Sequence, residues 1–351
     1  MATFLSSNSY LGLAPEATRG TAPTTGFVYI PVDTPQVTPN QRFLRDEALR
    51  GSPVSVYDQI QGVRHDEYDF KTYIYADTFP NIITSILGGN DLLAGTGPYT
   101  HAISAYTNAA NGSQPKSYTI VDFDGANYFT LTGAQASDAT ITFGAEKAAD
   151  AAIKFIANPY TSGTSAPSGF SPSYSAEHMV PGWDVSVSIG GTASGNTVTG
   201  GTVINYVQEG EIKIDRKTAP IFTVNSTNGP RQNFAGPIDV TGRLLMVVDS
   251  TSDLFSTGSS AYGFGYQPQP LVIVLTDPND ASHSVSFQMS KAQFQDVKRQ
   301  RGKAYTEVEV NFTATANAND AAGSSTTHDS VYSPIRTVTT NGQSTAYQSA
   351  Y

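Results

Sequence analysis

The stretch Tyr305-Thr306-Glu307-Val308-Glu309-Val310-Asn311-Phe312 alternates polar and apolar side chains. Successive side chains of a β-strand point to opposite faces, so this period of two predicts a half-buried strand. The apolar side chains then face a core, and Glu307, Glu309 and Asn311 point the other way. Comparable strand patterns fall in residues 118–132, 139–143, 152–157, 183–189 and 203–216, so the sequence predicts a mainly β protein.

The composition agrees with this fold class and restricts the chemistry. The 351 residues include 19 Tyr, 17 Phe and 31 Gly, which suit strands and the turns between them. Only 14% of the residues are charged, against about 25% in an average globular domain. Such a shortage fits a subunit that copies of itself cover. The absence of cysteine excludes disulfides and thiolate metal sites.

The start of the chain and its hydropathy predict a protein that stays soluble until it assembles. Residues 1–8 have neither a cationic start nor an apolar run, which argues against a signal peptide. No stretch approaches the roughly 20 apolar residues that span a bilayer. We therefore expect synthesis in a cytoplasm and no membrane partner.

The two halves of the chain resemble each other. In each half a strand leads to a short helix, which Asp77-Thr78 begins in the first half and Asp249-Ser250 in the second. A hairpin follows in both halves. Identical residues then recur at a constant offset of 158 positions: Phe129, Ala134, Gln135 and Asp138 align with Phe287, Ala292, Gln293 and Asp296. We therefore expect two tandem sheet-plus-helix modules.

The composition along the chain predicts five segments. They are an N-terminal arm (1–41), a first module (42–160), a linker (161–181), a second module (182–316) and a C-terminal arm or tail (317–351). The arm contains an apolar alternation at 27–32, which is either part of a frayed terminus or a strand that pairs with a neighbour's sheet edge.

No catalytic motif stands out. The five histidines have no metal-ligand spacing, and no nucleophile elbow, phosphate-binding loop or dinucleotide fingerprint is present. We expect no enzyme activity, no metal and no cofactor.

Charged residues on strands are more informative. Like charges stand two residues apart on one strand face at Glu67 and Asp69, Glu209 and Glu211, and Glu307 and Glu309. Such ladders cost stability, so they mark either a solvated face or a surface that repels phosphates. The densest basic run holds Lys298, Arg299, Arg301 and Lys303. We interpret it as a loop, either solvated or forming salt bridges with the next ring of an assembly; a nucleic-acid site is a further alternative, although no aromatic stacking partners lie close by in the sequence.

Several segments resemble the tail tube proteins of long, non-contractile-tailed (siphovirus-like) bacteriophages. They are residues 9–21, 211–217, 234–244 and 305–310. The resemblance implies β-sandwich or half-barrel modules, six to a ring, with rings stacked around a tape-measure protein. It also implies tail terminator and tail tip proteins as partners, assembly in the host cytoplasm, and a place in the virion tail through whose lumen double-stranded DNA passes without specific binding.

If each chain holds two modules, a ring of six modules needs half as many chains as the resemblance implies. Six modules would then come from three chains, giving a trimeric, pseudo-sixfold ring, with a hexamer as the alternative. We expect part of the net charge of −10 to line the lumen, with the six carboxylates above as candidates, because a basic wall would bind phosphates and hold DNA. A phage or bacterial surface β-sandwich protein that binds a host or carbohydrate stays open as an alternative. A glycosidase with paired carboxylates also stays open.

Overall fold

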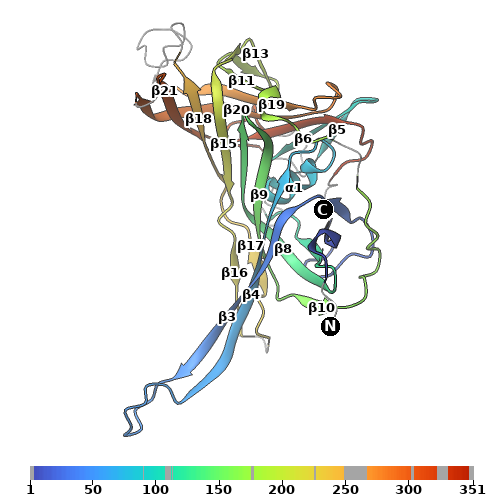
Figure 1. Ribbon diagram of the computed structural model, residues 1–351, viewed down its shortest axis with the longest axis vertical. Helices are drawn as coiled ribbons and strands as arrows, with labels where there is room; N and C mark the ends of the chain where they lie inside the picture. The colour runs from blue at the N-terminus through green and yellow to red at the C-terminus, as the bar shows by residue number, and fades with distance from the viewer. Residues whose placement is uncertain are drawn as a thin grey trace.

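A computed structural model describes residues 4–89, 91–106, 112, 114–174, 178–224, 227–248, 267–301, 304–321 and 331–347. The prediction of a mainly β protein is confirmed: long antiparallel strands run through the molecule, and one α-helix accompanies them in the described part (Figure 1). The strands bury alternate side chains, as the period of two predicts. In β21 (Glu307–Ala314), Val308, Val310 and Phe312 are buried.

The elements up to the middle of the chain are η1 (Ser6–Asn8), β1 (Tyr10–Pro15), β2 (Val28–Ile30), β3 (Asp33–Asp46), β4 (Asp58–Tyr73), α1 (Phe79–Leu87), β5 (Leu92–Ala94), β6 (Tyr99–Ser104), β7 (Tyr118–Phe123), β8 (Tyr128–Gly144), β9 (Lys147–Ala157) and β10 (Thr161–Gly163). The remainder are η3 (Gly182–Asp184), β11 (Val185–Ile189), β12 (Thr192–Ser194), β13 (Thr197–Thr199), β14 (Thr202–Val203), β15 (Val207–Asp215), β16 (Ala219–Ile221), β17 (Gln232–Phe234), β18 (Asp239–Val247), β19 (Gln269–Thr276), β20 (Ser284–Gln300), β21 and β22 (Arg336–Asn341).

The strands form two sets with the same pairing order. The first set runs β3-β4-β9-β8-β7-β1-β2, and the second runs β15-β18-β21-β20-β19-β11-β14. Both sets also contain a bulge at the corresponding place in the hairpin, between Tyr118 and Ile120 in β7 and between Gln269 and Leu271 in β19. The repeat seen in the sequence is thus a repeat of topology.

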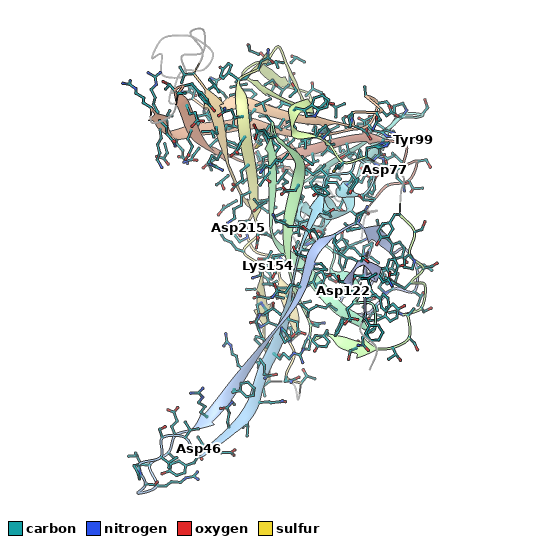
Figure 2. All side chains as sticks on the ribbon, in the orientation of Figure 1. Asp46, Asp77, Tyr99, Asp122, Lys154 and Asp215 are labelled. Atoms are coloured by element: carbon teal, nitrogen blue, oxygen red, sulfur yellow. The ribbon has the colours of Figure 1, made fainter. Side chains whose placement is uncertain are left out.

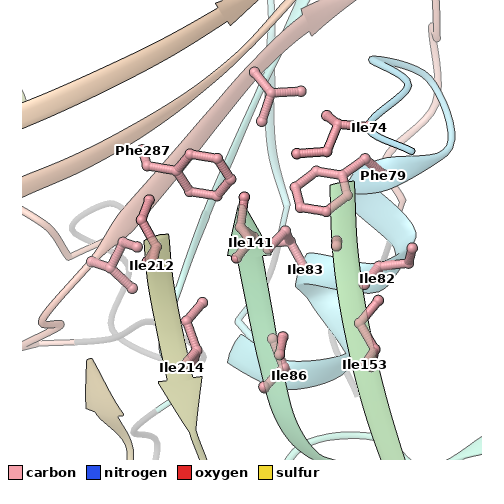
Figure 3. Close-up of a cluster of buried hydrophobic side chains, with 14 of the residues drawn as sticks. Ile74, Phe79, Ile82, Ile83, Ile86, Ile141, Ile153, Ile212, Ile214 and Phe287 are labelled. Carbon is pink, nitrogen blue, oxygen red and sulfur yellow. The ribbon is translucent and has the colours of Figure 1, made fainter. Parts of the chain in front are cut away.

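The two sets share one sheet and one core. The second half of β8 pairs with β15, which joins the first set to the second. On the apolar side, isoleucines of α1 pack over Ile141 and Ile153 of the first set, in a cluster that also contains Phe287 of the second (Figure 3). Phe79 and Phe287 meet edge to face with ring centroids 6.0 Å apart. The halves are therefore one folded body.

Helix α1 lies where the sequence predicts it, between Thr78 and Gly88. Gly88 ends it in the left-handed conformation (φ +74°), and a Cβ there would lie 2.3 Å from the Pro115 side chain, so a glycine is needed. Thr78 makes no side-chain capping bond. The helix expected after Asp249 lies outside the described residues.

Strands near both ends of the chain belong to the sheet. Residues 28–30 pair with β1 of the same chain, where the sequence suggested fraying or a neighbour's edge. Near the other end, β22 pairs with both β20 and β6. Strands β3 and β4 run on past the body as a long projecting hairpin (Figure 1), whose apolar side chains Phe43, Leu44, Leu49 and Ile60 are exposed.

Candidate assembly surface

All six carboxylates singled out in the sequence lie on one face of one continuous sheet. The strand order β4-β9-β8-β15-β18-β21 brings their residues into register, and they alternate with the buried core residues. We call this polar side the acidic face. Its acidic side chains are Glu67, Asp69, Asp138, Asp150, Glu209, Glu211, Asp215, Asp239, Glu307 and Glu309, and its basic ones are Lys71, Lys154, Lys213 and Arg243.

Charged side chains lie close together where strands of the first set form the acidic face. Lys154 of β9 forms an ion pair with Glu67 at 2.7 Å (Nζ to Oε2), and the hydrogen bond between them raises the pKa of Lys154. Burial raises the pKa of Asp69, the charges of Glu67 and Asp138 raise it further, and Lys154 opposes them. The pKa of Asp138 is raised mainly by burial. A single lysine thus holds several carboxylates together.

Arg243 likewise lies between carboxylates where strands of the second set form the acidic face. Its guanidinium lies 3.9 Å from a carboxylate oxygen of Glu211 and 3.8 Å from one of Glu309, so it bridges β15 and β21 across β18. Glu209 and Glu307 line a cleft at the end of these strands. Glu307 is buried, and among the six candidates it has the least access to solvent.

The basic run lies on a strand and at an edge. Lys298 and Arg299 belong to β20, where the sequence suggested a loop, and Arg301 follows directly; Lys303 lies outside the described residues. The pattern was hard to recognise as a strand because few apolar side chains alternate with the charges. Lys298 lies opposite Glu309 of β21.

Two outer strands of the sheet that carries the acidic face have strand pairing on one side among the described residues. Strand β3 pairs with β4 on one side, and residues 295–300 of β20 pair with β21 on one side. They stand at opposite ends of the sheet that carries the acidic face. The outer strands of a sheet are the places where another chain can add a strand.

Sequence reasoning missed Lys154, Arg243, Asp138, Asp215 and Asp239 as members of the acidic face. Each lies in a strand where polar and apolar residues largely alternate, so the period of two could have assigned it to a polar face. Which strands adjoin one another depends on long-range pairing, and local patterns do not reveal it. Figure 2 places Lys154 and Asp215 in the middle of the molecule, far from Asp46 on the projecting hairpin.

Other kinds of site are not apparent in the described residues. They contain no group of three or more His, Asp or Glu placed to hold a metal ion. Among them, no helix is both long and apolar enough to cross a membrane. The described residues therefore form a β-sheet protein whose sheet has one apolar face and one charged face.

Comparison with known protein families identifies the class to which this β-sheet protein belongs. The family model of the phage tail tube protein matches residues 6–346. The chain therefore belongs to the phage tail tube protein family, which is a family of structural proteins of the phage tail and not of enzymes. The hypothesis reached from residues 9–21, 211–217, 234–244 and 305–310 is confirmed.

A solved structure similar to part of the chain is that of the SPP1 tail tube, determined by solid-state NMR and cryo-EM. It is 14% identical, with a TM-score of 0.29, over 38% of this chain and 74% of that one. A search of curated proteins found no match.

Proposed function

We propose that the chain assembles into stacked rings that form the tail tube, and that its acidic face lines a lumen through which DNA passes during genome ejection. The observation that carries this proposal is the acidic face itself, a single polar surface spanning both strand sets. The opposite side of the sheet is covered by α1 and the core, which leaves the acidic face free to border a channel.

An acidic wall suits a conduit for physical reasons. A Lys or Arg that pairs with phosphate releases condensed counterions, and that gain would hold DNA in the tube. Carboxylates repel phosphates and leave the DNA hydrated and mobile. On the acidic face, Lys154 and Arg243 stand within reach of carboxylates of the same sheet. These pairs reduce the number of cations offered to a passing phosphate.

The repeated strand order supports a ring of three chains. Two equivalent sets per chain give six sets from three chains, related by pseudo-sixfold symmetry. It also favours module boundaries near Ser6 and Gly182, because η1 and β1 to β3 have counterparts in η3, β11, β14 and β15. Partners in this proposal are adjacent rings, a tape-measure protein inside the growing tube, and tail terminator and tail tip proteins at its ends, with assembly in the host cytoplasm.

Negative-stain electron microscopy of the purified protein tests the proposal. We expect hollow tubes or rings whose number rises with protein concentration. Dispersed monomers at every concentration, with or without tape-measure protein, would contradict it. A control with the Leu244→Asp variant, which places a charge in the core, should yield neither tubes nor folded protein.

A further inference from the structure

The segment that follows β22 lies at the surface of the protein and is tied to it by side chains. We call residues 343–347 the strap. Its first four residues are exposed, and Tyr347 is half-buried. The backbone N–H of Gln343 donates to Asn341 Oδ1 (3.0 Å), and Asn341 Nδ2 donates to the hydroxyl of Tyr347 (2.7 Å). The strap therefore leaves from a buried asparagine and returns to it.

A buried pair of side chains fastens the strap to the body. The side chains of His101 in β6 and of Asp91 have no exposed surface. His101 Nδ1 lies 2.6 Å from Asp91 Oδ2, and His101 Nε2 lies 2.9 Å from the backbone oxygen of Gln343. Asp91 Oδ2 also accepts the backbone N–H of Tyr347 (2.9 Å), whose ring meets the imidazole edge to face with centroids 4.6 Å apart. One buried pair thus binds both ends of the strap.

Both ring nitrogens of His101 face hydrogen-bond acceptors. A carbonyl oxygen and a carboxylate have no hydrogen to donate, and a neutral imidazole carries hydrogen on only one of its nitrogens. The two contacts are therefore both satisfied only when His101 and Asp91 share one extra proton, either as imidazolium beside carboxylate or as imidazole beside carboxylic acid. Without that proton, a buried lone pair of the ring points at an oxygen, which costs free energy.

The other titratable groups near the pair differ from it. Burial raises the pKa of Tyr347, the hydrogen bond from Asn341 lowers it, and the charges of Asp77 and Asp91 raise it, so this hydroxyl stays neutral at moderate pH. Tyr99 stands two residues from His101 on the same strand, and Figure 2 shows it on the same side of the molecule as Asp77.

The neighbouring strands add no charge beside the imidazole. Strands β5 and β22 place Leu93 and Thr339 opposite His101. A second histidine lies where the strap begins: His283 Nε2 is 3.9 Å from the position that a Cβ would take on Gly342. Its Nδ1 lies 3.9 Å from Asp280 Oδ2 in the turn between β19 and β20. His283 does not contact the buried pair, which makes it a suitable control.

We propose that the proton shared by His101 and Asp91 is a pH-sensitive fastening, which holds the strap on the body and releases it as the pH rises. In water a histidine has a pKa of about 6.5 and an aspartic acid one of about 3.9. Above about pH 6.5 the fastened strap therefore holds one proton more than the free strap, so rising pH favours release. This inference goes beyond the proposed function and does not depend on it.

Release of the strap would change a defined part of the surface. The strap forms one wall of a cleft of about 580 Å³, whose other walls include Phe27, Tyr29 and Thr78. These residues lie next to and in β2 and just before α1. Opening the strap therefore uncovers the cleft without breaking a strand pair of the sheet.

Electron paramagnetic resonance of a spin label on the strap tests the proposal. Ser344→Cys gives a single attachment point, because the chain has no cysteine of its own, and Ser344 is exposed. The label should be immobilised at about pH 6 and mobile at about pH 9, a range in which histidines change charge. One coupled proton changes the ratio of free to fastened strap by up to about tenfold for each pH unit above the midpoint.

Two further variants of the labelled protein identify the group responsible. His101→Gln cannot donate to both acceptors by gaining a proton, so its label should show no pH dependence between these limits. His283→Gln is the matched control and should respond as the parent does. A strap that is immobile, or mobile, throughout the range in the parent overturns the proposal, as does a response that survives in His101→Gln or disappears in His283→Gln.

Nuclear magnetic resonance of the protein with ¹⁵N-labelled histidine decides the matter without a change in the buried pair. The ring signals of His101, assigned by single substitutions of the other histidines, should change with the same midpoint as the release of the strap. Ring signals that stay constant over this range, or that change at a midpoint more than about one pH unit from the release, overturn the proposal even if His101→Gln fails to fold. Tube formation is not needed for either measurement, so the proposed function stands in each case.

Discussion

Glu16 holds together segments that are distant in the sequence. Its buried carboxylate accepts hydrogen bonds from the hydroxyls of Ser117 and Thr119 and from the backbone N–H groups of Gly20 and Gly133. These donors lie beside β1, β7 and β8. The N-terminal segment is thereby fixed to the hairpin of the first set.

Replacing this carboxylate leaves four donors without their acceptor. We expect Glu16→Ala to lower the free energy of unfolding by about 2–5 kcal/mol, since each buried unsatisfied group costs about 1–3 kcal/mol and partial rehydration limits the sum. Urea denaturation followed by circular dichroism measures the change. The exposed Glu47→Ala on the projecting hairpin is the matched control and should change stability by less than about 0.5 kcal/mol. Equal midpoints for the two variants would contradict this account of Glu16.

Asp122 gives the protein a pH-dependent stability. Burial raises its pKa from 3.8 to about 6, an interaction with Tyr68 lowers it, and the charge of Asp124 raises it. The folded chain thus keeps this proton up to about pH 6, whereas the unfolded chain releases it near pH 4. The charged carboxylate therefore destabilises the folded state above about pH 6, and that cost disappears as the pH falls to about 4.

The variant Asp122→Asn removes this cost. At pH 7 we expect it to be more stable than the unmodified protein by up to about 3 kcal/mol, which is about 1.4 kcal/mol for each unit of the shift. The difference should shrink between pH 6 and pH 4. Denaturation midpoints of both proteins across this range measure it, and a constant difference would show that Asp122 has an ordinary pKa.

Single residues were predictable where local pattern decides their role. Alternation in 305–312 identified Val308, Val310 and Phe312 as core, because a strand face is a local property. Alternation placed Glu307 on the polar side but could not reveal its burial, which depends on strand ends packed around it. The bridge from Arg243 to Glu211 and Glu309 needed the pairing of β15, β18 and β21, which are far apart in sequence.

At the scale of elements, the basic end of β20 is the first place to test assembly. Reversing its charge in Lys298→Glu/Arg299→Glu/Arg301→Glu should repel acidic groups of a neighbouring copy and weaken polymerisation. We expect at least a tenfold higher protein concentration for tube formation, measured by sedimentation, with less effect of the change at high salt. Lys291→Glu, exposed in the first half of the same strand, is the control. Unchanged tube assembly by the triple variant would remove the basic run from the interface.

Elements with strong local signals were predicted well. Helix α1 has a run of isoleucines ended by glycine, and the β7–β8 hairpin has an Asp124-Gly125 turn. The strands near the ends of the chain were predicted less well. Strands β2 and β22 are short, and their partners β1 and β20 lie elsewhere in the sequence. The basic run was read as a loop because charge hid its alternation.

At the scale of the whole molecule, two equivalent strand sets and one acidic face that spans both of them form a coherent description of a tube subunit. The repeat was visible in the sequence through a few identities at one offset. The single sheet that continues from set to set was not, because the pairing of β8 with β15 depends on the folded chain.

Cryo-electron microscopy of assembled tubes tests the central claim most directly. The account predicts three chains in each ring, with Glu67, Asp69, Glu209 and Glu211 facing the bore. Six chains in each ring would refute the two-module ring. A bore lined by the helix side of the sheet, or by a neutral or basic surface, would contradict the acidic conduit.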